Sequence, residues 1–213
     1  MVERELLQEI SGSLERGEID GGRYLEQFTR LLVSQIGCTR ATVRVFVDAP
    51  GGRALRSIAM YDASQDRMVA TEDLLRADSG PYFERLLQEG CIVVSDTRAD
   101  PIVAPFRTGY LEPNGIRSVM DMCFAVNGEL FGTFSCEQLN EPVEWSPRQV
   151  QMLRKLASRA SLTLMHVVNV TVDTAPGALW ETSTPNRLAT MPIPLDPSPD
   201  LNLSPQPRAT RQP

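Results

Sequence analysis

The stretch from Gly115 to Gln138, GIRSVMDMCFAVNGELFGTFSCEQ, decides the fold. Two runs rich in β-forming residues flank Asn127-Gly128, the strongest two-residue signal for a hairpin, because a type I′ turn needs positive φ at both central positions. We therefore predict paired antiparallel strands over 116–126 and 129–138. Cys123 and Cys136 are then strand residues rather than loop ligands.

Helices are predicted on both sides of this hairpin in the sequence. Apolar residues recur at helical spacing over 2–16 and 22–36. After the hairpin, Ser146-Pro147-Arg148-Gln149 has the pattern of a capping box that begins a helix. This last helix has an apolar seam that is expected to face the sheet or a partner helix, formed by Val150, Leu153, Ala157, Ala160 and Leu164.

The middle of the chain changes period. TVRVFVDA (42–49) alternates as a strand with one buried face, and 53–62 is predicted as the returning strand. Residues 81–89 suit a short helix, and CIVVSD (91–96) suits a buried strand. Residues 96–115 contain three prolines and are expected to be irregular, with at least one helical turn near 106–111.

Composition limits the class of function. The net charge of −6 and the pI near 4.9 argue against binding to a phosphate backbone, which needs a basic surface. No signal peptide or membrane-length apolar run is recognisable, so a cytoplasmic location is expected, with no membrane partner. The four cysteines form no CxxC pair, and His166 has no second ligand at helical spacing, so no metal is predicted.

The C-terminal part differs from the rest. Nine of the sixteen prolines lie between Pro176 and Pro213, with little periodicity. A segment of this composition buries too little apolar surface to offset its ordering entropy. We predict an N-terminal helix over 1–20, a folded domain over 21–169 and a Pro-rich disordered tail over 170–213.

Over about Leu6 to Met165 the chain resembles a GAF domain of the kind found in bacterial sensor histidine kinases and diguanylate cyclases. The residues that carry the resemblance are VVSDTRADPIVAPFRTGYLEPNGIRSVMDM, VNGELFGTFSCEQ and EWSPRQVQMLRKLASRASLTL. The resemblance implies an α+β fold, in which the N- and C-terminal helices cover one face of an antiparallel sheet. Residues 81–115 would form a lid of short helix and loops over a ligand cleft on the other face.

The cleft is the expected binding site for an unidentified small molecule. Aromatic walls and a few convergent polar groups are typical of such pockets, and the candidates are Tyr82, Phe83, Asp96, Phe106, Tyr110, Arg117 and Asp121. Arg117 is suited to a bidentate contact with an anionic group. The alternative is structural: Asp96 and Asp121 cap the backbone of the lid, and Arg117 pairs with one of them.

Two cysteine-based functions are alternatives to a structural role for the cysteines. Some GAF proteins reduce free methionine sulfoxide, and Cys91 and Cys123 are the pair that would meet at the cleft. The loop cysteines of that pattern are missing here, and buried free cysteine is common in cores. Asp121-Met122-Cys123-Phe124 is similar to the Asp-x-Cys-Phe motif of some cyanobacteriochromes, but no Cys-His pair follows, so no bilin is expected.

The interpretation favoured by the sequence is a non-catalytic sensory protein in signal transduction. It would bind a small ligand in the cleft, form a homodimer through its terminal helices and signal to a separate partner protein; no cofactor is identified. The alternatives are a structural dimerisation module without ligand and a thiol-dependent methionine sulfoxide reductase.

Overall fold

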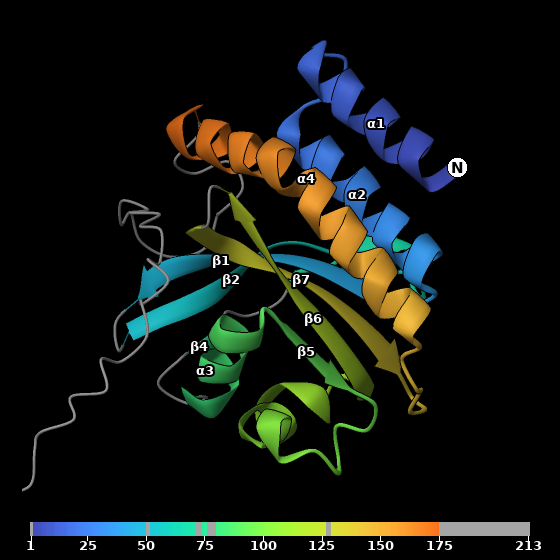
Figure 1. The fold of residues 1–213 in the computed structure, drawn as a ribbon, viewed down its shortest axis with the longest axis vertical. Helices are drawn as coiled ribbons and strands as arrows, with labels where there is room; N and C mark the ends of the chain where they lie inside the picture. Colours follow the sequence, from blue (N-terminus) through green and yellow to red (C-terminus); the bar gives the residue numbers. More distant parts are fainter. Residues whose placement is uncertain (1, 50–51, 71–73, 76–79, 127–128, 175–213) are drawn as a thin grey trace, which may run out of the picture.

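The computed structural model describes residues 2–49, 52–70, 74–75, 80–126 and 129–174 (Figure 1). Among them, a seven-stranded sheet runs in the order β3-β2-β1-β7-β6-β5, with β4 paired to β2, and all pairs are antiparallel. The strands are β1 (Arg40–Ala49), β2 (Gly52–Asp62), β3 (Arg67–Met68), β4 (Leu74–Leu75), β5 (Cys91–Val94), β6 (Ile116–Val126) and β7 (Glu129–Leu139).

One face of the sheet is covered by the terminal helices α1 (Val2–Glu15), α2 (Gly21–Ile36) and α4 (Pro147–Thr174) (Figure 1). Asp20 caps α2 by accepting from the Arg23 N–H at 2.7 Å, and Gly37 ends this helix at a φ of 74°, which favours glycine. The apolar residues of α2 and α4 meet alternate residues of the strands, including Val43, Val45, Met120 and Phe134.

The opposite face lies under α3 (Gly80–Glu89), the 3₁₀ segment η2 (Pro101–Phe106) and the π-helical segment η3 (Arg107–Leu111). These three elements are called the lid here. Their buried side chains and those of the strands beneath form a second, smaller apolar cluster that includes Phe46, Phe83, Leu86 and Leu111. The sheet is therefore enclosed by helices on both faces, with the terminal helices on one face and the lid on the other, as the sequence predicted.

The hairpin prediction is confirmed by the register of β6 and β7, which pairs Val126 with Glu129 and Met122 with Phe134. The Asn127-Gly128 turn itself lies outside the described residues. The capping box at the start of α4 is also confirmed. The Ser146 N–H donates to Gln149 Oε1 at 2.9 Å, and the Gln149 N–H donates to Ser146 Oγ at 3.3 Å. The tail predicted over 170–213 lies mostly outside the described residues, while α4 extends to Thr174.

The apolar seam of α4 is used within this chain. Leu153, Ala160 and Leu164 are fully buried, and they belong to the same cluster as the sheet and α2. Of the two roles predicted for this seam, packing on its own subunit is the one that the structure shows. A contact with a second subunit must therefore use other side chains of α4.

Gly132 on β7 is the position where the sheet tolerates no side chain. A Cβ atom there would lie 1.9 Å from the Arg44 carbonyl oxygen and 2.8 Å from the Phe124 ring. The first obstacle is backbone of the neighbouring strand, which cannot rotate away. This close approach holds β1 and β7 in the register that places Arg44 beneath the lid.

We expect Gly132→Ala to lower the free energy of unfolding by about 3 kcal/mol, at the upper end of the range for overpacking. Gly109→Ala is the matched control, because a Cβ atom at Gly109 meets nothing within 4 Å and its φ is not positive. Urea denaturation of both variants measures the difference. Equal stability of the two would contradict the steric role of Gly132.

Candidate functional site

The lid face of the central strands is polar, although it is buried. The register places Thr42 and Arg44 of β1 opposite Ser135 and Thr133 of β7, and it places Asp121 of β6 opposite Ser135. These five residues are at most 2% exposed. Because successive side chains of a strand alternate between faces, the residues between them form the apolar face beneath α2 and α4. The sheet is thus apolar toward the helices and polar toward the lid.

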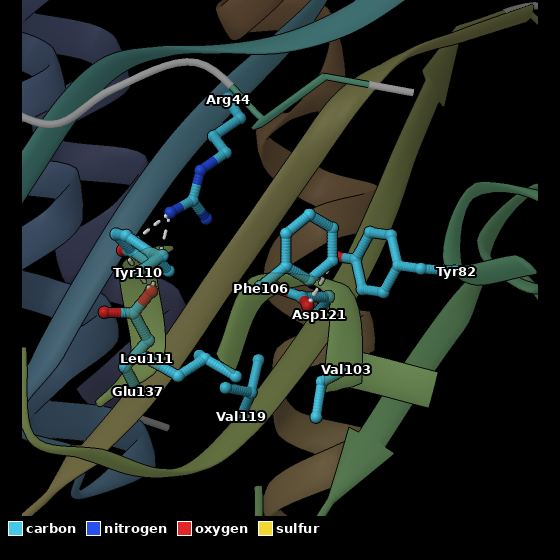
Figure 2. Close-up of a pocket in the computed structure, with 9 residues that line it drawn as sticks. All are labelled: Arg44, Tyr82, Val103, Phe106, Tyr110, Leu111, Val119, Asp121 and Glu137. Carbon is cyan, nitrogen blue, oxygen red and sulfur yellow. Dashed lines mark hydrogen bonds and ion pairs between the residues drawn. The ribbon is translucent and has the colours of Figure 1, made fainter. Parts of the chain in front are cut away.

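A cavity remains between this polar floor and the lid (Figure 2). Its volume is about 20 Å³, room for one or two water molecules rather than for an organic ligand. Figure 2 shows its lining residues, which are Arg44, Tyr82, Val103, Phe106, Tyr110, Leu111, Val119, Asp121 and Glu137. The cleft expected from the sequence is therefore present but is largely filled by its own aromatic side chains.

The first polar group of the cavity centres on Arg44. Its Nη2 donates to Tyr110 Oη at 2.9 Å and lies 3.5 Å from Glu137 Oε1, and its Nη1 donates to Ser135 Oγ. Tyr110 Oη in turn donates to Glu137 Oε1 at 2.7 Å. Arg44 and Glu137 are 2% and 1% exposed, so this ion pair is fully buried. It connects two central strands to η3 of the lid (Figure 2).

The second polar group joins α3 to β6. Tyr82 Oη donates to Asp121 Oδ2 at 2.7 Å, and the Phe106 ring stands edge-on to the Tyr82 ring with a centroid distance of 4.9 Å. Burial raises the pKa of the Asp121 carboxyl above its ordinary value, although Arg44, Ser135 and Tyr82 act in the opposite direction. Burial likewise raises the pKa of Tyr82, and so does the neighbouring Asp121 carboxylate. The carboxyl is therefore a group whose charge is incompletely compensated.

Four of the seven residues predicted for the site line the cavity: Tyr82, Phe106, Tyr110 and Asp121. Phe83 lies beside them but packs into the apolar cluster against Phe46 and Tyr82. Their assignment to ligand binding stays a prediction.

Asp96 and Arg117 lie outside the cavity and are engaged with each other. Arg117 Nη2 donates to Asp96 Oδ1 at 3.1 Å, and Asp96 also accepts from the Arg98 N–H at 3.0 Å. These contacts are the structural alternative that the sequence left open. An anion-binding role for Arg117 in the cavity does not fit this placement, because its side chain lies outside the lining and is paired with Asp96.

Sequence reasoning missed Arg44 and Glu137, the charged pair at the centre of the site. The alternation of β1 had placed Arg44 on the face away from the helices, and only the lid makes that face buried. The available signal was a charged residue in each of two predicted strands, which the structure shows to be central in the sheet. A central strand covered on both faces buries its charges, and such charges are nearly always paired.

The cysteines do not gather at the cavity. Cys91 packs on the helix-face cluster and Cys123 on the lid-face cluster, and neither lines the cavity. Burial raises the pKa of Cys123 to about 12, which disfavours a reactive thiolate. Cys38 and Cys136 are buried near each other under the helices, and contact with Cys38 raises the pKa of Cys136. All four are free thiols.

Metal and membrane features are also unsupported in the described part of the chain. No group of three His, Cys, Asp or Glu side chains there is arranged to hold a metal ion. No described helix combines the length and the apolar content that crossing a membrane requires.

The comparison with known families agrees with this architecture. The model of the GAF domain family matches residues 20–164, so the chain belongs to the GAF domain family. A search of curated protein sequences found no significant match.

Similar solved structures are GAF domains of varied context. The blue-light absorbing form of the PixJ GAF domain of Thermosynechococcus elongatus is 17% identical with a TM-score of 0.57, over 76% of this chain and 94% of that one. The GAF domain of a phosphoenolpyruvate-protein phosphotransferase of Coxiella burnetii is 15% identical with a TM-score of 0.58, over 79% and 95%. A GAF domain/HD domain protein of Geobacter sulfurreducens is 15% identical with a TM-score of 0.53, over 70% and 95%. At these identities the likeness establishes the fold.

The buried pair Arg44–Glu137 and the partly exposed pair Arg117–Asp96 are expected to contribute very differently to the stability of the protein. Arg44→Met leaves Glu137 buried without its counter-charge, and we expect a loss of about 3–5 kcal/mol in the free energy of unfolding. Arg117→Met removes a partly exposed pair, with an expected cost of about 0–1 kcal/mol. Urea denaturation compares them. The double variant Arg44→Met/Glu137→Gln should regain much of the loss, and a double variant as unstable as the two single losses combined would refute the pairing.

Proposed function

We propose that this GAF domain is a sensory module that binds a small molecule beneath the lid and passes the signal through its terminal helices to a separate partner protein. The observation that carries the proposal is the polar floor of the cavity. A fold that needs only a sealed core has no use for buried charges with open hydrogen-bonding positions, yet Arg44, Asp121 and Glu137 each have an unpartnered polar atom among the described residues.

The lid is suited to opening because it is short and is fastened to the sheet at a few polar points. Tyr110 bonds to Glu137 and Tyr82 to Asp121, and Arg40 Nη1 donates to Asn114 Oδ1 at 3.3 Å where the lid ends. A ligand larger than the 20 Å³ cavity would displace the Tyr110 contact and move η3. The same displacement would release Arg44 and Glu137, which belong to the strands that carry α2 and α4 on their other face.

Native mass spectrometry of the full chain tests the proposal. We expect a small non-covalent adduct on the wild-type protein. Val119→Phe fills the cavity and should lose the adduct, whereas Val93→Phe, on the exposed side of neighbouring β5 and outside the cavity, should retain it. Absence of an adduct from wild type, or its retention in Val119→Phe, would contradict binding at this cavity.

A purely structural module is the second candidate, and the small cavity volume favours it. In that case the aromatic side chains of the lid fill the cavity permanently, and the buried charges serve only to stabilise the closed position of the lid. It predicts an adduct-free protein whose lid contacts contribute to stability alone.

A homodimer through the terminal helices is part of the proposal, and the surface charges of the helices support it. Between Pro147 and Val172 the sequence has four cationic residues and no acidic one, whereas α1 has four acidic residues and one basic one. Arg148, Lys155 and Arg159 are exposed and have no ion-pair partner in the part of the chain that the structure describes.

Exposed leucines accompany these charges. Leu162 of α4 is 65% exposed and Leu6 of α1 is 39% exposed. At 100° per residue Leu162 shares a face with Lys155 and Arg159. On α1, Leu6 likewise shares a face with exposed Glu5 and Glu9. In the proposed dimer, α1 of each subunit packs on α4 of the other, so that both contacts form twice about a twofold axis.

Charge reversal tests this dimer. We expect Lys155→Glu/Arg159→Glu and Glu5→Lys/Glu9→Lys each to be monomeric by light scattering at micromolar concentration, because each sets like charges against each other. Mixing the two variants should restore the dimer, since both contacts are again complementary. Arg85→Glu/Arg98→Glu makes the same net charge change as Lys155→Glu/Arg159→Glu, but on the lid side, and should remain dimeric. A monomeric wild-type protein, or no recovery on mixing, would contradict the arrangement.

A further inference from the structure

Unpartnered buried polar atoms are concentrated on one surface of the molecule. Among the described residues seven buried side-chain nitrogen or oxygen atoms have no hydrogen-bond partner. Five of them lie on the lid face of β1, β6 and β7: Thr42 Oγ1, Arg44 Nε, Asp121 Oδ1, Thr133 Oγ1 and Glu137 Oε2. Because buried polar groups are almost always paired, this surface is where an additional molecule supplies partners.

Of these five groups, the Asp121 carboxyl is one for which a missing hydrogen-bond partner costs the most free energy, because it can carry a full charge. It is 2% exposed, it lines the cavity, and its Oδ2 accepts from Tyr82 while its Oδ1 has no partner among the described residues. A buried carboxylate oxygen without a donor is costly unless a proton or a cation compensates its charge. Asp121 therefore either keeps its proton or requires a cationic hydrogen-bond donor beside Oδ1, and the second state is the one that a ligand can supply.

The charges of the cavity favour a cation over an anion. Among the described residues of its lining Arg44 is the one cation, and both of its terminal nitrogens are already engaged by Ser135, Tyr110 and Glu137, which leaves only Nε open. Two carboxyl groups, Asp121 and Glu137, stand against this single guanidinium. When both are ionised, the cavity has an excess of negative charge, which repels carboxylate or phosphate.

We propose that the cavity takes the amidinium or ammonium head group of a small cationic ligand, which donates N–H bonds to the open oxygens of Asp121 and Glu137. This inference rests on the proposed function and names the ligand class of the same site. The aromatic residues Tyr82, Phe106 and Tyr110 offer ring faces and edges around the cavity, and ring faces attract cations. The closed cavity of about 20 Å³ is too small for such a head group, so its entry requires the lid to move, with the rest of the ligand reaching out past the lid.

Three probes of nearly the same shape isolate the charge: acetamidinium, acetamide and acetate. Thermal unfolding of the full chain and calorimetric titration are followed at constant ionic strength with each probe. We expect acetamidinium to bind at least tenfold more tightly than acetamide and to raise the Tm through mass action, and we expect acetate to have no effect. A stronger effect of acetate, or equal effects of the three probes, would overturn the inference.

The pH dependence gives a second readout. The groups facing Asp121 are Arg44 from β1, Tyr82 from α3, Cys123 from its own strand, Tyr110 from η3 and Glu137 from β7. Burial holds the Asp121 pKa above the ordinary value, so the carboxyl keeps its proton to a higher pH. Acetamidinium stays protonated, and its affinity should rise with pH as Asp121 ionises. An affinity that is flat, or that falls with pH, would contradict the inference.

Asp121→Asn should abolish the preference for acetamidinium over acetamide, because the variant keeps the shape of the side chain and removes its charge. Asp96→Asn, whose carboxylate lies outside the cavity, should behave as wild type. If Asp121→Asn does not fold, the probe ranking and the pH profile of the wild-type protein decide.

The outcomes separate this inference from the function on which it rests. A native adduct lost in Val119→Phe, together with a preference for acetate, would leave the sensory role intact and refute the cationic ligand. A protein with no adduct and no probe binding would refute both.

Discussion

The Arg44–Glu137 pair is the interaction on which the site depends. Both side chains project from central strands of the sheet to a face that the lid seals from water. Each charge would be expensive there alone, and together with Tyr110 and Ser135 they satisfy most of their hydrogen-bonding capacity. Because Tyr110 belongs to η3, the closed position of the lid is fixed by the same contacts that neutralise the buried charge.

The two faces of the sheet differ in composition. The helix face is apolar and packs against α2 and α4, where burial of side chains such as Phe28, Phe134 and Leu153 supplies the main driving force for folding. The lid face has a smaller apolar cluster around a polar centre. In the proposed function, the strands shared by both faces, above all β1 and β7, would transmit a shift of the lid to the helices without any change in topology.

Several residues that the sequence proposed for the site line the cavity, although their role in ligand binding stays a prediction. Tyr82, Phe106, Tyr110 and Asp121 were assigned to the cleft from residue type and from the lid implied by the family resemblance, and all four line the cavity. Arg117 was assigned by the same reasoning and lies outside, paired with Asp96. Arg117 lies at the start of β6, next to the loop that contains Asp96. No local sequence pattern predicts that these two residues are close in space.

Local patterns in the chain were enough to predict the elements and the family. Period-2 and period-3.6 patterns, the capping box at Ser146 and the strands on either side of Asn127-Gly128 are local properties of the chain, and they predict strands and helices because backbone geometry is local. Only the tertiary structure decided that Arg44 and Glu137, 93 positions apart in the chain, meet beneath one tyrosine. It also decided that the seam of α4 is used inside the subunit and that the cavity is small. Burial and charge pairing depend on which distant segments of the chain cover a surface. They can therefore be determined only when the tertiary structure shows those segments in place.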